Sequence, residues 1–209
     1  SGTDSSTGNG PYSVGQAFTL IVAAPTLTLA PAPTTFTPTY AAPFSQTFGA
    51  AGGIGPYAYS VTGTLPTGLT LSGDTVSGTP TAPGNYVVLI TATDTGSSGT
   101  GAPFTIGQSY TFDVAAPTIA VAPTTLPDTV AGLSYSQTLS ASGGVAPYTF
   151  AVTAGGLPNG LNLTAVGALS GTSTTAGTSN FTVTATDANG QSGAQAYTVV
   201  VAVPTLTLT

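Results

Sequence analysis

The sequence contains no lysine, arginine, histidine, cysteine, methionine or tryptophan, and its six acidic residues are all aspartate. Without cationic side chains the protein has nothing to neutralise phosphate groups, which excludes nucleic acids and anionic membranes as partners. Salt bridges between side chains are excluded for the same reason. Without cysteine no disulfide can staple the fold. Stability must therefore come from burial of apolar groups and from backbone hydrogen bonds.

Charged residues make up only 3% of the 209 residues, against about a quarter in an ordinary globular chain. Hydrophobic residues make up 41%, which is too many for a disordered chain despite 28 glycines and 17 prolines. They occur in short runs broken by Thr, Gly and Pro, and none approaches the roughly 18 residues that span a bilayer. The sequence thus predicts a folded protein without direct membrane insertion.

Two stretches of the sequence hold the same landmarks in the same order. These are GG-x-x-PY, LP-x-GL-x-L, SGT and a β-branched run that ends in TATD. The first copy covers residues 52–94 and the second covers residues 143–187. Corresponding landmarks lie 91 to 93 residues apart. The chain is therefore a tandem array with a period of about ninety residues.

This period divides the chain into two complete repeats, residues 24–116 and residues 117–203. Residues 1–23 align with residues 93–115, so we expect them to be the final strand and loop of a preceding repeat, or a donated strand. Residues 204–209 restart the pattern and are expected to form the first strand of a further repeat. Each complete repeat is long enough to bury a core of its own.

Each repeat is expected to contain about seven short strands and no helix. In the first repeat the predicted strands cover residues 26–31, 44–51, 57–62, 75–77, 85–94 and 106–114. In the second they cover residues 118–123, 134–141, 148–153, 161–163, 168–170, 178–187 and 194–202. Strands at this spacing, separated by Gly and Pro turns, predict an all-β fold of Greek-key β-sandwiches. The short proline-bearing junctions at Pro25, Pro117 and Pro204 favour an extended array.

Two further predictions concern particular side chains. Phe18, Leu20 and Val22 alternate along the chain, which is typical of a half-buried strand. The leucines of the LP-x-GL-x-L motif in the first repeat are expected to close one edge of the sandwich: Leu65, Leu69 and Leu71.

The combined landmarks resemble the immunoglobulin-like repeats (He-PIG type) of large bacterial surface proteins. A similar pattern occurs in dystroglycan-type cadherin-like domains. The resemblance covers essentially the whole chain and implies tandem immunoglobulin-like sandwiches in an adhesin-like protein at the cell surface or outside the cell. It supplies no catalytic residues.

No enzymatic activity is expected, and neither a catalytic residue nor a cofactor site is predicted. A nucleophilic triad needs a base such as histidine or lysine, and both are absent. Two aspartates can hydrolyse a glycosidic bond, but Asp113 aligns with Ile21 and Val200 rather than with acids. Asp74 lies in a predicted turn.

The aspartates are candidate calcium ligands. Asp94 and Asp187 recur at the end of the same strand, as does Asp4, just before a Gly-rich loop, while Asp113 and Asp128 flank the junction between the repeats. Calcium takes six to eight oxygen ligands, often including several carboxylates, and in cadherin-like arrays a junction is where bridging ions sit. The alternative is that the recurring aspartate closes its own loop by accepting backbone N–H bonds. The absence of a D-x-D cluster favours this alternative.

Glycans provide the remaining site candidates. Asn162 and Asn180 each begin an N-x-T sequon. Aromatic residues such as Phe104 and Tyr40 stand in predicted loops, and the second repeat has Val130 where the first has Tyr40. Such aromatics can contact sugars, but the loop aromatic recurs, as Tyr12 and Phe104, and this favours packing of these aromatics against a neighbouring domain.

The sequence as a whole predicts a structural segment of an extracellular bacterial fibre or adhesin stalk, which provides length, stiffness and protease resistance. Its partners would be neighbouring immunoglobulin-like repeats or identical subunits, the latter polymerised by strand complementation. Host or matrix glycans would be bound by other parts of the protein. The alternative is that the repeats themselves form a glycan- or calcium-binding adhesion module.

Overall fold

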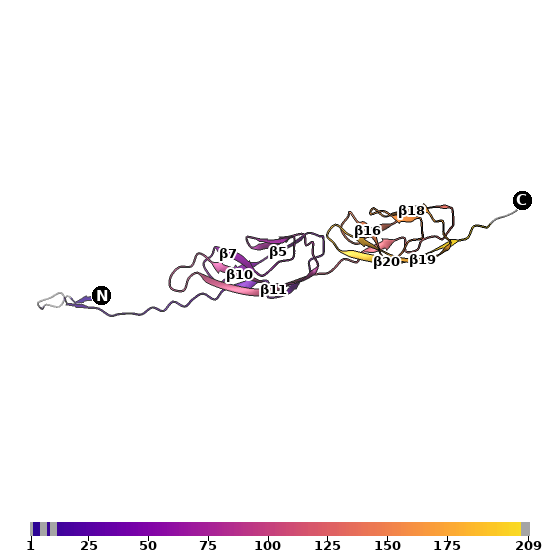
Figure 1. Cartoon of the computed structure of the whole chain (residues 1–209). Coiled ribbons are helices and arrows are strands. Elements are labelled where there is room, and N and C mark those ends of the chain that lie inside the picture. Colours follow the sequence, from indigo (N-terminus) through magenta and orange to yellow (C-terminus); the bar gives the residue numbers. More distant parts are fainter. Residues whose placement is uncertain (1, 5–7, 9–11, 206–209) are drawn as a thin grey trace.

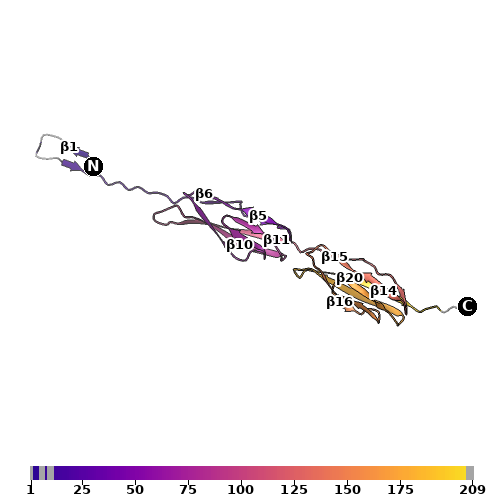
Figure 2. The same ribbon diagram turned by 90° about the horizontal axis from the view of Figure 1, so that it is seen from above.

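The computed structural model of the protein describes residues 2–4, 8 and 12–205. All regular structure in this part of the chain is β-strand, and the strands from β3 onwards form two sandwiches that lie end to end (Figures 1 and 2). The immunoglobulin-like, all-β fold predicted from the sequence is confirmed. None of the described residues belongs to a helix with the length and apolar character to cross a membrane.

The first repeat runs from β3 to β11. Its strands are β3 (Thr28–Ala30), β4 (Thr35–Phe36), β5 (Phe44–Thr47), β6 (Gly49–Ala51), β7 (Tyr57–Thr62), β8 (Leu69–Ser72), β9 (Thr75–Gly78), β10 (Gly84–Asp94) and β11 (Phe104–Val114). One sheet has the order β4-β11-β10-β7 and another has the order β5-β9-β8, while β3 pairs with β6. β11 and β10 are the longest strands and form the central antiparallel pair.

The second repeat copies this arrangement from β12 to β20. Its strands are β12 (Ala120–Ala122), β13 (Thr129–Val130), β14 (Ser134–Thr138), β15 (Ser140–Ser142), β16 (Thr149–Gly155), β17 (Leu161–Leu163), β18 (Ala168–Thr172), β19 (Gly177–Thr186) and β20 (Ser192–Ala202). The sheets have the orders β13-β20-β19-β16 and β14-β18-β17, and β12 pairs with β15. The two repeats therefore share one topology.

Each sandwich has its own hydrophobic core. Along β10 the side chains of Val88, Ile90 and Ala92 are buried, whereas Val87 on the opposite face is exposed. This alternation places one face of the strand inside the sandwich. Leu69 is buried in the first core, and Leu65 and Leu71 pack against it, as predicted. The two cores share no residue.

The region predicted as one strand over residues 44–51 is interrupted at Phe48. The half before it, β5, pairs with β9, while the half after it, β6, pairs with β3. Phe48 is fully buried, and its backbone N–H donates to the carbonyl of Asp74 (2.8 Å). The chain thus passes from one sheet to another at a single core residue.

In both repeats the first segment is tied to the last strand. β4 pairs in parallel with β11, and β13 pairs in parallel with β20. The hydroxyl of Tyr110 on β11 donates to the carbonyl of Pro31 (2.6 Å), and Tyr197 on β20 donates to Pro123 (2.6 Å). In each sandwich, the segment through which the chain enters is therefore hydrogen-bonded to the strand through which it leaves.

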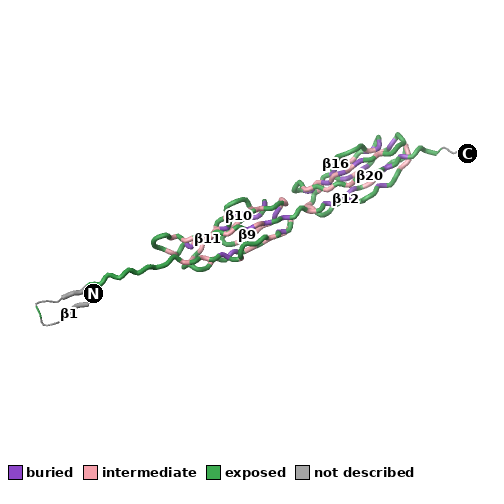
Figure 3. The backbone as a smooth tube through the Cα atoms, turned by 90° about the horizontal axis from the view of Figure 1, so that it is seen from below, coloured by how far each residue is buried: buried purple, intermediate pink, exposed green. Residues whose placement is uncertain are grey.

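The segment before the first repeat differs from the prediction. Residues 18–22 form no strand, and Phe18, Leu20 and Val22 are each more than 80% exposed (Figure 3). None of the described strands pairs with this segment, and a strand without a partner cannot satisfy its backbone groups. Upstream of it, β1 (Gly2–Asp4) pairs with β2 (Tyr12–Val14). The strand predicted over residues 204–209 lies largely outside the described residues.

Candidate functional site at the aspartate loops and the junction between the repeats

Asp94 stands at the last position of β10, at the end of the sandwich that faces away from the second repeat. It is fully buried. One carboxylate oxygen, Oδ2, accepts the amide of Ile54 (3.0 Å) and the hydroxyl of Ser97. The other, Oδ1, accepts the amides of Gly55 (3.0 Å), Gly96 (3.1 Å) and Ser97 (3.3 Å). The carboxylate thereby joins the Gly-Gly turn to the Gly/Ser loop.

The ionised form of Asp94 is strongly favoured. The hydroxyl of Ser97 lowers the pKa of Asp94 to about 2, because it outweighs the effect of burial and is supported by the amides of Ile54, Gly96 and Ser97. The same carboxylate explains why the second position of the GG-x-x-PY motif must be glycine. A Cβ on Gly53 would lie 2.0 Å from Oδ2 of Asp94.

Asp187 occupies the corresponding position directly after β19 and is also buried. Its Oδ1 accepts the amides of Asn189 (2.9 Å) and Gln191 (2.8 Å). Its Oδ2 accepts the amide of Val145 (3.0 Å) and the phenol hydroxyl of Tyr40 (2.8 Å). Tyr40 belongs to the first repeat, so this hydrogen bond crosses from one sandwich to the other.

Burial opposes the ionisation of Asp187, but its hydrogen bonds with Val145, Tyr40, Gln191 and Asn189 prevail and lower its pKa. The pKa of the Tyr40 hydroxyl is raised, first by burial and then by its hydrogen bond to Asp187. At neutral pH the pair is therefore a neutral phenol that donates to a carboxylate, which is a charge-assisted hydrogen bond.

The aspartate loop of the second repeat lies at the junction of the two sandwiches. A cavity of about 360 Å³ opens beside Tyr40, and its wall includes Asp113, Pro117 and Gly143. Val145 is half-buried at this end of the second repeat. Its counterpart in the first repeat, Ile54, is 77% exposed. The surface around Val145, which faces the first repeat, is thus more buried than the equivalent surface around Ile54 at the other end of the first repeat.

The four candidate calcium ligands are distributed over separate places. Asp94 and Asp187 lie in different loops, and each is surrounded by N–H and O–H donors. This arrangement agrees with the alternative that the recurring aspartate closes its own loop. Asp113 is exposed beside the junction cavity, and Asp128 is exposed and accepts the amide of Val200 (2.8 Å). The residues that the structure describes include no group of three or more acidic, His or Cys side chains placed to hold a metal ion. The side chain of Asp4 lies outside the described part.

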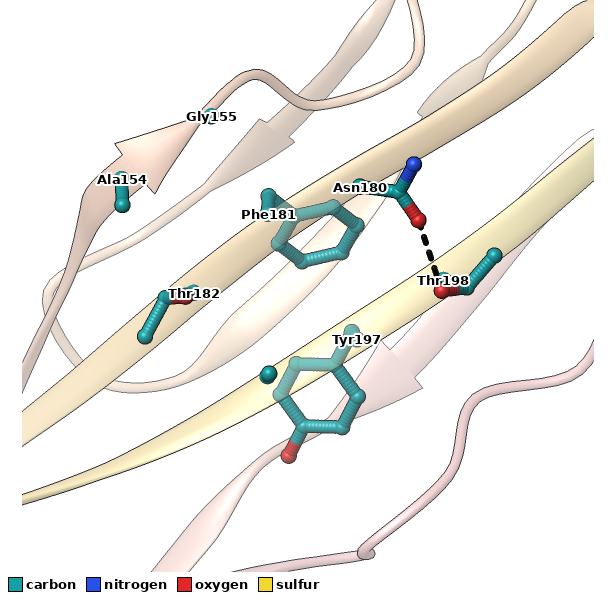
Figure 4. A pocket seen from close by; sticks show the side chains of 8 residues that line it. Ala154, Gly155, Asn180, Phe181, Thr182, Tyr197 and Thr198 are labelled. Atoms are coloured by element: carbon teal, nitrogen blue, oxygen red, sulfur yellow. Dashed lines mark hydrogen bonds between the residues drawn. The ribbon is translucent and has the colours of Figure 1, made fainter.

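Both sequon asparagines are exposed on strands. Asn162 lies on β17, and Asn180 lies on β19 opposite Thr198 of β20. The hydroxyl of Thr198 donates to the side-chain oxygen of Asn180 (2.7 Å), and Figure 4 shows the amide nitrogen turned away from that bond. The nitrogen that a glycan would modify is therefore free of this contact.

Sequence reasoning found the recurring aspartate but not all of its partners. Tyr40 was expected to pack against a neighbouring domain, and its hydrogen bond to Asp187 does join the two repeats. The role of Ser97 was missed, although a hydroxyl residue three positions after a loop aspartate is a recognisable signal. The roles of Tyr57 and Tyr148 were missed as well: their hydroxyls accept the amides of Gly53 and Gly144.

Together, the shared topology and the repeated aspartate loop define a tandem array of immunoglobulin-like sandwiches. The family model described as "Putative Ig domain" (He_PIG) matches residues 18–115 and again residues 116–202. The chain belongs to this family. Repeats of this fold are typically extracellular and non-enzymatic, and the fold is compatible with adhesive or structural roles.

Solved structures with partial similarity include cadherin repeats. Mouse cadherin-23 EC22-24 is 14% identical with a TM-score of 0.39, over 85% of this chain and 67% of that chain. Protocadherin Gamma B2 extracellular cadherin domains 3-6 are 12% identical with a TM-score of 0.37, over 86% of this chain and 53% of that chain. A "putative alpha-galactosidase" of Bacteroides fragilis is 20% identical with a TM-score of 0.35, over 41% of this chain. This chain covers only 18% of that enzyme. Among curated proteins, none matches the sequence.

Proposed function

We propose that the protein is a load-bearing spacer segment of an extracellular bacterial fibre or adhesin stalk. The observation that carries this proposal is the tie between the first segment and the last strand of each sandwich. The chain enters a sandwich at one end and leaves it at the other (Figure 2). Tension along the array therefore slides β4 along β11, and β13 along β20, and loads their hydrogen bonds together.

Composition supports the same role. The absence of lysine and arginine removes every trypsin site, and the absence of cysteine removes dependence on a redox environment. The described surface is rich in Thr, Ser and Gly, which neither titrate nor react readily. Such a segment suits long exposure outside the cell.

Single-molecule pulling tests the load-bearing role. The chain would be attached through Gly15→Cys and Thr205→Cys, which are unique thiols in this sequence. Two unfolding events are expected, one for each sandwich. Tyr110→Phe removes the hydroxyl that donates to Pro31 and should lower the rupture force of one event only. Tyr86→Phe is the matched control, because that hydroxyl contacts only the nearby carbonyls of Ala82 and Pro83 (3.4 Å each). Equal forces for the two variants would contradict the proposal.

The cellular placement has its own test. Immunolabelling of intact cells that produce the protein should give signal at the outer surface, and micrographs of isolated material should show thin rods. Label that appears only after the cells are opened would refute the extracellular assignment.

Polymerisation by strand complementation is a second candidate, favoured by the unpaired apolar segment around Phe18, Leu20 and Val22. It would complete a sheet edge in an identical subunit. Mass measurement of native material distinguishes the cases. A ladder in steps of about 20 kDa supports subunit assembly, whereas one very large covalent chain defeats it.

The alternative of a glycan- or calcium-binding adhesion module makes different predictions. Calcium at Asp94, Asp187, Asp113 or Asp128 requires that excess EDTA lower the melting temperature, while the spacer role requires no change. Glycan arrays probed with the two-repeat chain test the sugar version, and an array without hits removes it.

A further inference from the structure

The two aspartate loops share one plan but take the hydroxyl donor to Oδ2 from different places. In both, Oδ1 accepts backbone amides, and Oδ2 accepts one backbone amide together with one hydroxyl. On Asp94 that hydroxyl belongs to Ser97, within the same loop. On Asp187 it belongs to Tyr40, in the neighbouring repeat.

The sequence explains why the sources differ. The loop of the first repeat has Ser97 three residues after Asp94, whereas the second has Gly190 three residues after Asp187. Gly190 supplies no hydroxyl, so Oδ2 of Asp187 depends on a donor from outside its own loop. Tyr40, in the segment between β4 and β5, reaches it across the junction. The sequence alignment sets Val130 against Tyr40, but the structure sets Ala131 there, because the following residues, Ala41 and Gly132, both have a positive φ and donate their amides to the equivalent carbonyls of Pro80 and Ser173. Neither valine nor alanine has a side chain that can donate.

We propose that the Asp187 loop is a docking site for the C-terminal end of the preceding repeat, with the Tyr40 hydroxyl as the group that it recognises. The fitting partner is a sandwich of this family that presents a phenol at that position. The Asp94 loop, whose corresponding place is filled by Ser97, requires no such partner. A repeat without a phenol at this position, such as the second repeat, therefore fits a following loop that carries its own hydroxyl, as the Asp94 loop does, rather than a loop that lacks one. This docking would hold whether or not the array is an extracellular stalk, so it stands apart from the proposed function.

Docking of this kind fixes the orientation of the pair. Domains joined by a small interface move relative to each other unless specific contacts restrain them. A hydrogen bond to a buried carboxylate provides such a restraint, because its loss would leave an ionised oxygen short of one donor. The junction between the two repeats is thus held in a defined geometry by one phenol.

Spin-label distance measurements test this proposal directly. The sequence has no cysteine, so Ser109→Cys on β11 and Ser136→Cys on β14 give one label in each sandwich at exposed positions. The otherwise unchanged chain should give one narrow distance distribution. Tyr40→Phe keeps the aromatic ring and removes only the hydroxyl, and it should widen the distribution at least twofold. Asp187→Asn should widen it as well.

Tyr57→Phe is the matched control, because the Tyr57 hydroxyl accepts the amide of Gly53 within the first repeat and does not reach the junction. It should leave the width unchanged. Circular dichroism of every variant establishes that the sandwiches are folded. A folded Tyr40→Phe chain with the original narrow distribution would overturn the proposal, and so would a broad distribution in the parent chain.

Discussion

At the scale of single residues, the molecule depends on two buried carboxylates that no cation accompanies. The negative charges of Asp94 and Asp187 are stabilised by amide and hydroxyl donors. This is a consistent solution for a chain without lysine, arginine or histidine. Buried charge is tolerated when its hydrogen-bonding capacity is satisfied, and in the described residues every buried side-chain oxygen or nitrogen has a partner.

Acid should weaken the first repeat through Asp94. Its pKa is about 2 in the folded protein and near 3.8 when unperturbed. The unfolded chain then binds more protons than the folded chain, so stability is full above about pH 4 and is lost as the pH falls towards 2. Calorimetry across this range should show the melting temperature falling with acid. Ser97→Ala removes the leading cause of the low pKa and brings the folded value closer to the unfolded one, so its melting temperature should fall less between pH 4 and 2 than that of the parent chain. An unchanged profile in this variant would contradict the assignment.

At the scale of elements, two of the sequence motifs mark a site where two backbone segments pack too closely for a side chain to fit between them. Gly78, the glycine of SGT, has a positive φ of 139°, and a Cβ there would lie 2.0 Å from the carbonyl oxygen of Gly68. Gly68 is the glycine of LP-x-GL. The second repeat has the same contact between Gly171 and Gly160. Two landmarks that look independent in the sequence are therefore the two sides of one contact.

A substitution at this contact should be costly. Gly78→Ala adds a methyl group against backbone and requires a strained φ, so we expect a loss of more than about 2 kcal/mol in the free energy of unfolding. Gly49→Ala in β6 is the matched control, because nothing lies within 4 Å of its added Cβ. Its effect should stay within about 0.5 kcal/mol. Denaturant unfolding of both variants measures the difference, and equal losses would contradict the role of the contact.

Most strands could be predicted because they bury one face, which appears in the sequence as alternating apolar and polar residues. β7 and β17 match their predicted limits, and β10, β11, β19 and β20 differ from theirs by one or two residues. The parallel strands β4 and β13 could not be predicted, because each has two residues and its partner lies some seventy residues away. No strand is predicted at the LP-x-GL-x-L motif of the first repeat, where the structure has β8, whose leucines contribute to the core. Residues 18–22 show the opposite case, since an alternating pattern forms no strand without a partner.

The candidate site was predictable in part. The recurrence of Asp94 and Asp187 identified the loops, and the absence of clustered acids favoured loop closure over calcium. The source of the fourth donor was not predictable, because a hydrogen bond between residues 147 positions apart leaves no local pattern. The difference between Tyr40 and Val130 was the one sign in the sequence that the two repeats differ at the junction.

At the scale of the whole molecule, two folded sandwiches are preceded by an exposed segment (Figure 3). Proteases cut extended, unpaired chain much faster than paired strands. Limited chymotrypsin digestion should therefore cut first after Phe18 or Leu20, which are 85% and 87% exposed. Trypsin is the control and should leave the chain whole even after heating, because there is no lysine or arginine. Mass spectrometry of the products identifies the first cut, and an initial cut within a sandwich would contradict this picture.

The parallel pairings of β4 with β11 and of β13 with β20 hold each sandwich closed, so their rupture lets the whole repeat unfold. The longest strands have 11 residues, so a folded repeat measures on the order of 40 Å along the array. The same repeat of about ninety residues, fully extended, spans on the order of 300 Å. Each broken tie therefore releases roughly 250 Å of slack while the covalent chain stays intact. Because the repeats are connected in series, the weakest opens first and relieves its neighbours. For the load-bearing role that we propose, the expected consequence is a load limiter that lengthens stepwise under sudden strain and reforms when the strain ends.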